Sequence, residues 1–203
     1  QALLGLLERA RRETRSVGES ETAALAIAAT HALSFTFFPG WVREVTRSRA
    51  PGAINLISDS MTACEQLLLS GQVHFLLCHF HPDARAGLAA DRFPSLRVGG
   101  DVLVPMCAPD AQGQAKWSLE SGRTPPIPYL SYGEASGHGR IITACQGDKL
   151  AHAVTRFTSQ LAATLATMAR DGHGVAWLPR TLTSEDQRRG QLVRAGSVRL
   201  DIP

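Results

Sequence analysis

Short apolar runs alternate with stretches of helical periodicity along the first half of the chain. Each apolar run has the length of a buried strand, and the stretches between them repeat their apolar residues at helical spacing. The predicted strands are 25–29, 54–58 and 75–78, and the predicted helices are 35–49 and 61–69. Pro39 must then lie in the first turn of its helix, where its missing N–H is tolerated. This order predicts a parallel sheet with right-handed crossovers.

The second half of the chain repeats the alternation after a long extended run at 97–107, which Gly99 and Gly100 interrupt. The predicted strands are 129–132, 152–157 and 175–178, the predicted helices are 138–145, 158–170 and 181–189, and a last extended piece covers 192–199. Two series of strands and helices separated by an extended segment predict an α/β protein with two Rossmann-like lobes. We place lobe I at 22–101 and lobe II at 102–197.

A separate amphipathic helix is predicted at 1–19, before lobe I. Leu3, Leu6 and Leu7 form an apolar stripe, and arginines cover the remaining faces. Such a stripe needs a partner to cover it, so we expect this segment to be a linker helix used for dimerisation.

Composition restricts the class of protein. Of the 203 residues, 44% are apolar and 19% are charged, which excludes a disordered or low-complexity chain. The longest apolar run, 23–29, is too short to span a bilayer, so we expect no membrane partner. A net charge of +3 does not by itself indicate a nucleic-acid surface. Four cysteines without a CxxC pair predict reduced thiols in a cytoplasmic protein.

Signatures of catalysis are absent from the sequence, which contains no P-loop, no HExxH and no nucleophile elbow. His79 and His81 point the same way along a strand and could share a metal ion, but their neighbour Cys78 faces the opposite side, which weakens a three-ligand site. We therefore predict no metal site, no cofactor and no catalytic residue, and hence that the chain is not an enzyme.

Polar residues gather where the predicted strands end. Ligands bind outside the carboxyl ends of strands in open parallel sheets, and helix N-termini there favour anions. The expected effector-binding residues are Thr30, His31, Ser58, Asp59, His81, Tyr132, Thr158 and Ser159. A pair of histidines beside free helix N–H groups favours a small anionic or polar effector. The alternative is a purely structural role, in which these groups serve as caps and backbone partners.

The order of elements resembles the effector-binding region of LysR-type transcriptional regulators. The similar stretches are 30–39, with its hydrophobic pair and proline, and the GxGxxxLP segment at 172–179. Within the family, the stretches 80–83, 104–110 and 129–132 with Gly139-Arg140 resemble the hypochlorite-responsive subgroup.

Membership of this family implies a periplasmic-binding-protein-like (type 2) fold and assembly as a homodimer or homotetramer. It also implies that promoter DNA is read by an N-terminal winged helix-turn-helix, which this chain does not contain, and that residues 198–203 start the return to lobe I. The resemblance implies a domain that senses oxidant stress or a small anionic ligand. A periplasmic-type solute-binding protein has the same two-lobed fold and is the alternative.

The hypochlorite-responsive subgroup senses through methionines, and this chain departs from it there. Those methionines correspond to Val45, His138 and Leu161 here. Sensing by a cysteine, by a bound small molecule or by a bound oxyanion are the alternatives. The redox candidates are Cys78, Cys107, Cys145 and Met106.

Overall fold

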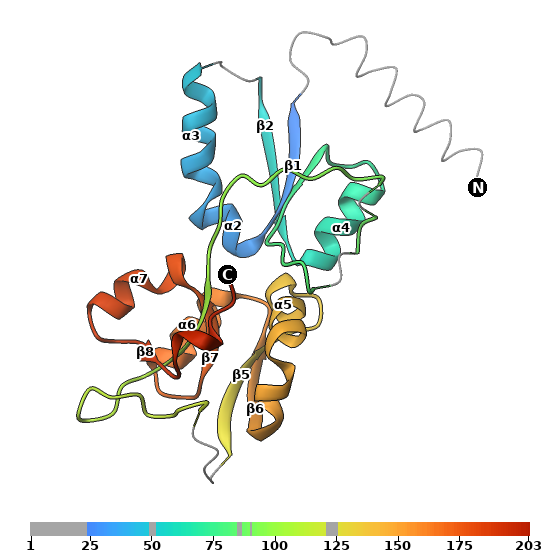
Figure 1. Ribbon diagram of the computed structural model, residues 1–203. Helices are drawn as coiled ribbons and strands as arrows, with labels where there is room; N and C mark the ends of the chain where they lie inside the picture. The colour runs from blue at the N-terminus through green and yellow to red at the C-terminus, as the bar shows by residue number, and fades with distance from the viewer. Residues whose placement is uncertain (1–23, 49–51, 85–86, 90, 121–125) are drawn as a thin grey trace.

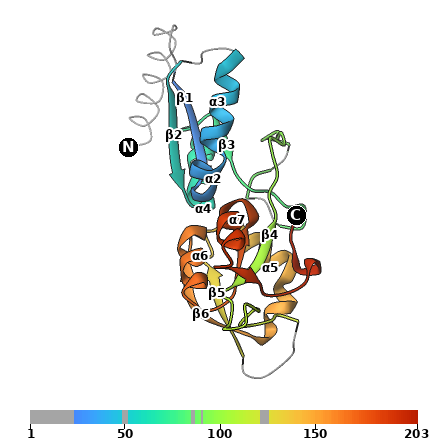
Figure 2. The same ribbon diagram turned by 90° about the vertical axis from the view of Figure 1, so that its left-hand side faces the viewer.

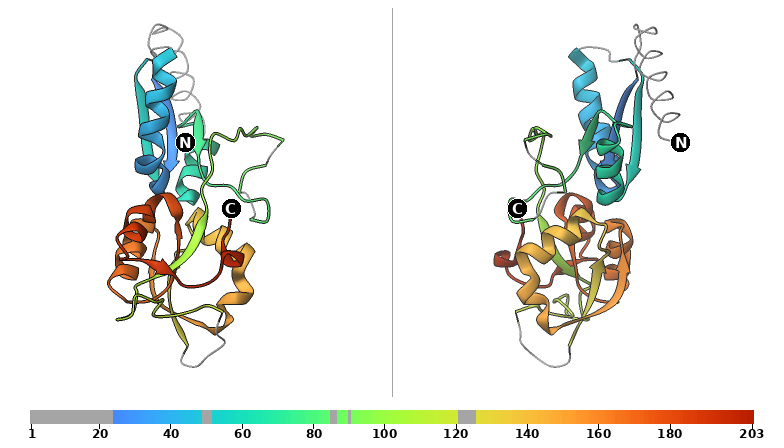
Figure 3. Two further views of the ribbon diagram at one scale, coloured as in Figure 1. Left: turned by 60° about the vertical axis from the view of Figure 1, so that its left-hand side comes forward. Right: turned by 90° about the vertical axis from the view of Figure 1, so that its right-hand side faces the viewer.

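The computed structural model describes residues 24–48, 52–84, 87–89, 91–120 and 126–203. The predicted helix at 1–19 lies outside these residues. The chain forms two α/β lobes, one above the other in Figure 1, and the turned view in Figure 2 shows the same separation. The segment between the two lobes runs along one side of the molecule (Figure 3). None of the helices in the described part of the chain is long and apolar enough to cross a membrane.

Lobe I contains a three-stranded parallel sheet in the order β2-β1-β3. Its strands are β1 (Leu25–Thr30), β2 (Ile54–Asp59) and β3 (Phe75–Leu77), and its helices are α2 (His31–Thr36), α3 (Phe38–Ser48) and α4 (Met61–Leu69). The crossovers place the carboxyl ends of β1 and β2 side by side, with Thr30 opposite Asp59. The parallel sheet predicted for this half of the chain is confirmed.

The single helix predicted at 35–49 is wrong, because two helices occupy this region. The first, α2, starts directly after β1, and α3 starts at Phe38. Pro39 is the second residue of α3, where its fixed φ fits and no backbone hydrogen bond is lost. The break at Phe37 therefore lets Pro39 occupy a first turn, as the sequence required.

Lobe II contains a mixed sheet with helices packed against it. Its elements are β4 (Leu103–Cys107), β5 (Ile127–Tyr132), α5 (Gly137–Gln146), η1 (Gly147–His152), β6 (Ala153–Ser159), α6 (Ala162–Arg170), β7 (Ala176–Pro179), α7 (Arg180–Arg188), β8 (Val193–Arg194) and η2 (Val198–Leu200). Strands β5 and β6 are parallel, whereas β4 runs antiparallel to β7 and β8. A bridge between Tyr129 and Val175 joins the two groups of strands.

Most of the buried apolar residues lie in lobe II. Trp177, Leu130 and Leu165 are completely buried in one cluster between the sheet and its helices. Trp177 Nε1 donates a 2.9 Å hydrogen bond to the Leu200 carbonyl, so the largest side chain of this core is also satisfied. Residues 198–203 lie against the same lobe, because Ile202 pairs with Leu103 and is buried.

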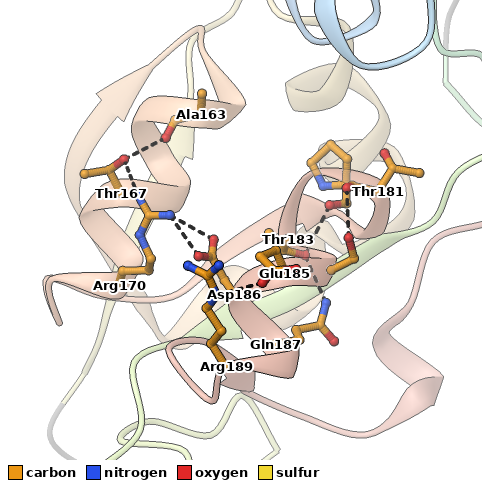
Figure 4. A network of polar contacts seen from close by, with 11 residues as sticks. Ala163, Thr167, Arg170, Thr181, Thr183, Glu185, Asp186, Gln187 and Arg189 are labelled. Atoms are coloured by element: carbon orange, nitrogen blue, oxygen red, sulfur yellow. Dashed lines mark hydrogen bonds and ion pairs between the residues drawn. The ribbon is translucent and has the colours of Figure 1, made fainter. Parts of the chain in front are cut away.

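Polar contacts hold α6 to α7 (Figure 4). Arg170 donates from Nη1 to both carboxylate oxygens of Asp186, at 3.0 and 2.9 Å, and from Nη2 to Thr167 Oγ1. Thr183 Oγ1 donates back to the Pro179 carbonyl at the start of α7. These contacts fix the C-terminal end of α6 relative to the helix that follows β7.

Two further predicted boundaries are wrong. Only residues 103–107 of the predicted extended run at 97–107 form a strand. The helix predicted at 158–170 starts at Ala162, because β6 extends to Ser159 through pairing with Tyr132 of β5. Sequence periodicity could not separate these alternatives, because strand length depends on the neighbouring strand that supplies the hydrogen bonds.

Candidate functional site

A pocket lies between the two lobes where α2 and α4 face α5 and α6, and we call it the interlobe pocket. Lobe I contributes Thr30, His31, Ala32, Asp59, Ser60 and His79, and lobe II contributes Ser136, Gly137, His138, Gln160 and Ala162. The cavity volume between them is about 20 Å³. In this arrangement of the lobes the pocket has room for about one water molecule or a simple ion, and a larger ligand needs the lobes to move apart.

Helix starts and strand ends form the walls of this pocket. β1 ends at Thr30 and passes directly into α2, and β2 ends at Asp59. Ser60 then caps α4 by accepting from the Ala63 amide, and Ser136 caps α5 by accepting from the Gly139 amide at 3.5 Å. Two helices of nine and ten residues thus begin at the pocket. Their first-turn N–H groups make this end of the cleft favourable for negative charge.

Unpartnered polar atoms are concentrated at the pocket. Among the described residues, the buried side-chain atoms without a hydrogen-bond partner are Thr30 Oγ1, His138 Nε2 and the Tyr132 hydroxyl. Thr30 and His138 both line the pocket, one from each lobe. The His138 ring packs against His79 at 4.4 Å and Tyr132 at 5.2 Å between centroids. Because a buried polar atom without a partner costs about 1–3 kcal/mol, a ligand that bonds to these atoms recovers that free energy.

Burial disfavours the charged form of two pocket histidines, His79 and His138. Burial lowers the pKa of His138 well below its usual value, and a positive charge on His79 would lower it further. Burial also lowers the pKa of His79, although the Asp101 carboxylate opposes that shift. A ligand that carries negative charge would reverse this balance by stabilising the protonated rings.

Comparison with known proteins identifies the family. The model of the LysR substrate binding domain matches residues 18–200. The chain belongs to this family. The predicted resemblance and the two-lobed, periplasmic-binding-protein-like fold are therefore confirmed.

The relatives of this LysR substrate-binding domain are transcriptional regulators. It is 30% identical over 205 residues to the HTH domain-truncated transcriptional regulator QseD of Escherichia coli O157:H7, covering 99% of this chain and 79% of that protein. It is also 30% identical to the HTH-type transcriptional regulator YjiE of Escherichia coli K12, of which it spans 63%. The apo regulatory domain of HypT from Salmonella typhimurium superimposes with a TM-score of 0.72 at 26% identity, covering 88% of this chain and 81% of that one.

Three of the eight predicted effector-binding residues line the interlobe pocket of the LysR substrate-binding domain: Thr30, His31 and Asp59. Ser58 lies beside them, since its Oγ is 3.2 Å from His31 Nδ1. The Tyr132 side chain is buried, and its ring packs against the His138 ring, with 5.2 Å between the centroids.

Like Ser58 and Tyr132, the remaining three predicted effector-binding residues do not line this pocket. Thr158 and Ser159 end β6 instead of starting a helix, and the Ser159 hydroxyl accepts from the Leu161 amide. His81 lies at a different contact between the lobes, 3.3 Å from the Cys145 sulfur. The expected convergence of all the strand ends on one cleft is therefore only partly met.

Several pocket residues were absent from the sequence-based prediction, above all His138, Ser136 and Gln160. Ser136 and His138 stand at the start of the predicted helix at 138–145, which is the position that cap and anion-site arguments favour. The sequence therefore contained a signal for these two residues. It contained none for Gln160, whose position follows from the extension of β6.

The four redox candidates differ in accessibility. Met106 and Cys107 are completely buried in β4, so an oxidant in solution cannot reach them in this arrangement. Cys78 and Cys145 are partly buried. Burial raises the pKa of both thiols, and the nearby Glu65 and Asp83 carboxylates add to this for Cys78 and Cys145 respectively.

An ion pair joins the lobes beside the pocket. Arg140 of α5 donates to both carboxylate oxygens of Glu65 in α4, at 2.8 and 3.0 Å, and to Thr62 Oγ1 at 2.8 Å. The Gly87 amide also donates to Glu65. Arg140 therefore attaches α5 to lobe I close to the residues of that helix that line the pocket, Gly137 and His138.

Proposed function

We propose that this chain is the effector-sensing and oligomerisation domain of a LysR-type transcription factor of the bacterial cytoplasm. In the whole protein, a winged helix-turn-helix binds promoter DNA, and the chains assemble as a homodimer or homotetramer. The family match and the two curated relatives, both transcriptional regulators, support this function over that of a solute-binding protein with the same fold. The chain spans 63% of the length of YjiE.

The interlobe pocket is the proposed effector site. The observation that carries this proposal is a pair of unpartnered buried atoms, Thr30 Oγ1 and His138 Nε2, whose residues come from opposite lobes and line one pocket. A ligand that bonds to both atoms binds best when the lobes are in one particular arrangement. Such differential affinity is what a ligand needs in order to shift the geometry of a regulator.

The proposed effector is a small polar molecule with an acidic group, or a simple oxyanion. The start of α5 and the imidazoles of His79 and His138 favour the negative end of the ligand. The Asp59 carboxylate, which accepts from the Ser60 amide at 2.6 Å, favours a hydrogen-bond donor on the opposite end. A regulatory domain of HypT has been solved with bromide bound, at 25% identity and a TM-score of 0.69, which supports an anion as one class of ligand.

A thermal-shift and calorimetric screen of small carboxylates, amino acids, halides and hypochlorite-like oxyanions tests the proposal. A ligand present at 100 times its Kd should stabilise the domain by about 2.7 kcal/mol. His138→Leu should abolish this stabilisation, and His173→Leu, at an exposed position, should leave it unchanged. A ligand that stabilises the His138→Leu variant as strongly as the unaltered domain would place the effector elsewhere.

A further inference from the structure

Three potential metal ligands meet at a second contact between the lobes. His81 and Asp83 follow β3, and Cys145 lies in the last turn of α5. Their ligand atoms all lie within 4.8 Å of one another. His81 Nδ1 is 3.3 Å from Cys145 Sγ and 3.9 Å from Asp83 Oδ2. We propose that His81, Asp83 and Cys145 form a Zn²⁺ site that bridges the two lobes.

The distances approach those of a tetrahedral zinc centre. Zn–S bonds of about 2.3 Å and Zn–N or Zn–O bonds of about 2.0–2.1 Å place neighbouring ligands about 3.3–3.6 Å apart. The contact between His81 and Cys145 already has this length. The ligand atoms of the cluster lie within 4.8 Å of one another, so Asp83 must move closer to the other two when an ion binds. Its side chain is 72% exposed, which leaves it room to move.

The Nδ1 atom of His81 is the ring nitrogen that faces the cluster. The Asp83 amide donates to it at 3.2 Å, so Nδ1 carries a lone pair and a neutral ring has its proton on Nε2. A metal ion would use this same lone pair, so the hydrogen bond from the Asp83 amide must break when the ion binds. The Cys145 sulfur lies 3.3 Å from the same nitrogen. A Zn²⁺ ion would take the place of the thiol proton, so that the S–H bond breaks, a Zn–S bond forms and the proton passes to water.

Cys145 and Asp83 contribute two ligand groups of this cluster that can be negatively charged. A divalent cation between them stabilises the thiolate and the carboxylate together. One sulfur, one imidazole nitrogen and one carboxylate oxygen form a donor set that zinc accepts, whereas Mg²⁺ and Ca²⁺ prefer oxygen ligands alone.

A groove beside the cluster offers a path for the ion and a fourth ligand. Asp83, Arg140, Thr143 and Ala144 line this groove, which opens to solvent. Three protein ligands with an open position is the arrangement of an exchangeable zinc site, in which water or a small ligand completes the shell. Because Cys145 belongs to the helix that begins at the interlobe pocket, zinc would fix that helix to the segment that follows β3.

From the sequence, His79 and His81 are the two histidines that could share a metal ion, because they are paired on one predicted strand. β3 ends at Leu77, and His79 packs against His138 in the interlobe pocket. Cys145 comes from the other lobe, 64 residues away from His81. Only the packing of the lobes brings these ligands together.

Metal binding to the chelator-treated, reduced domain tests this proposal, with Zn²⁺ competing against a chromophoric chelator. We expect one Zn²⁺ per chain and the release of the Cys145 proton, measured as a dependence of the binding enthalpy on buffer. Cys145→Ser and His81→Ala should each weaken binding by at least about tenfold, the lower bound found for weaker, outer-shell changes. Cys78→Ser and His152→Ala, which alter a cysteine and a histidine outside the cluster, should not.

Co²⁺ provides a second, spectroscopic readout. The unaltered domain should show a thiolate-to-Co²⁺ charge-transfer band, and the band should disappear in Cys145→Ser. Asp83→Asn, an exposed substitution with little risk to folding, should weaken binding without removing the band. The absence of the band from the unaltered domain would overturn the proposal, as would unchanged Zn²⁺ affinity in folded Cys145→Ser and His81→Ala.

Discussion

Removing Arg140 tests how strongly α5 is attached to lobe I. The Glu65 side chain is 7% exposed and holds the Arg140 guanidinium with both oxygens. Arg140→Ala removes these two bonds and the bond to Thr62, and leaves the carboxylate with the Gly87 amide but without its cation. Breaking a buried pair from one side costs about 3–5 kcal/mol. Because the Arg140 side chain is 27% exposed, water can reach the vacated space, and we expect about 3 kcal/mol.

Chemical denaturation followed by tryptophan fluorescence measures this loss. Trp41 of α3 reports on lobe I, and Trp177 of β7 reports on lobe II. The matched control is Arg47→Ala, which breaks an exposed pair with Glu44 and should cost less than about 0.5 kcal/mol. Since domains are stable by only about 5–15 kcal/mol, the expected difference between these two variants is easily resolved.

A double-mutant cycle separates the ion pair from simple loss of packing. In Arg140→Ala with Glu65→Gln, the buried carboxylate is no longer charged, so the double variant should be more stable than the sum of the single changes by at least about 1 kcal/mol. The reasoning is refuted if the two changes are additive, or if Arg140→Ala costs no more than Arg47→Ala.

Two further predictions concern stability. Burial lowers the pKa of His138 below its unfolded value of about 6.5, so the unfolded state binds the proton more readily, and stability should fall below that pH by up to about 1.4 kcal/mol per pH unit. Denaturation at pH 7.5 and 5.5 should show a smaller loss in His138→Asn, and an equal loss would contradict the assignment. Gly174→Ala should destabilise by about 3 kcal/mol or more, because its Cβ would lie 2.5 Å from the Pro128 carbonyl oxygen. Gly147→Ala, whose Cβ meets nothing within 4 Å, should be neutral within about 0.5 kcal/mol, and similar melting temperatures for the two variants would argue against this close approach.

Local chemistry was enough to predict the α/β class and part of the lobe I wall of the interlobe pocket. Strands β1 and β2 end at Thr30 and Asp59, and strands that are parallel must end at the same edge of their sheet. Helix α4 was predicted at its observed bounds, because Ser60 is a strong cap and Gly71, with a φ of +70°, permits the turn that ends it. These features depend on neighbours in sequence, which the order of residues reveals directly.

What only the tertiary structure decided is which residues from the two lobes meet. His138 reaches the pocket because α5 packs under α4, and its partner there, His79, comes from the other lobe. The same packing pairs Arg140 with Glu65 and Cys145 with His81, across 75 and 64 residues of chain. Contacts of this kind depend on the relative position of two separately folded sheets, and no periodicity or cap within either half of the sequence encodes that position. The amino-acid order therefore determined each lobe's elements, and the packing of the lobes determined the chemistry between them.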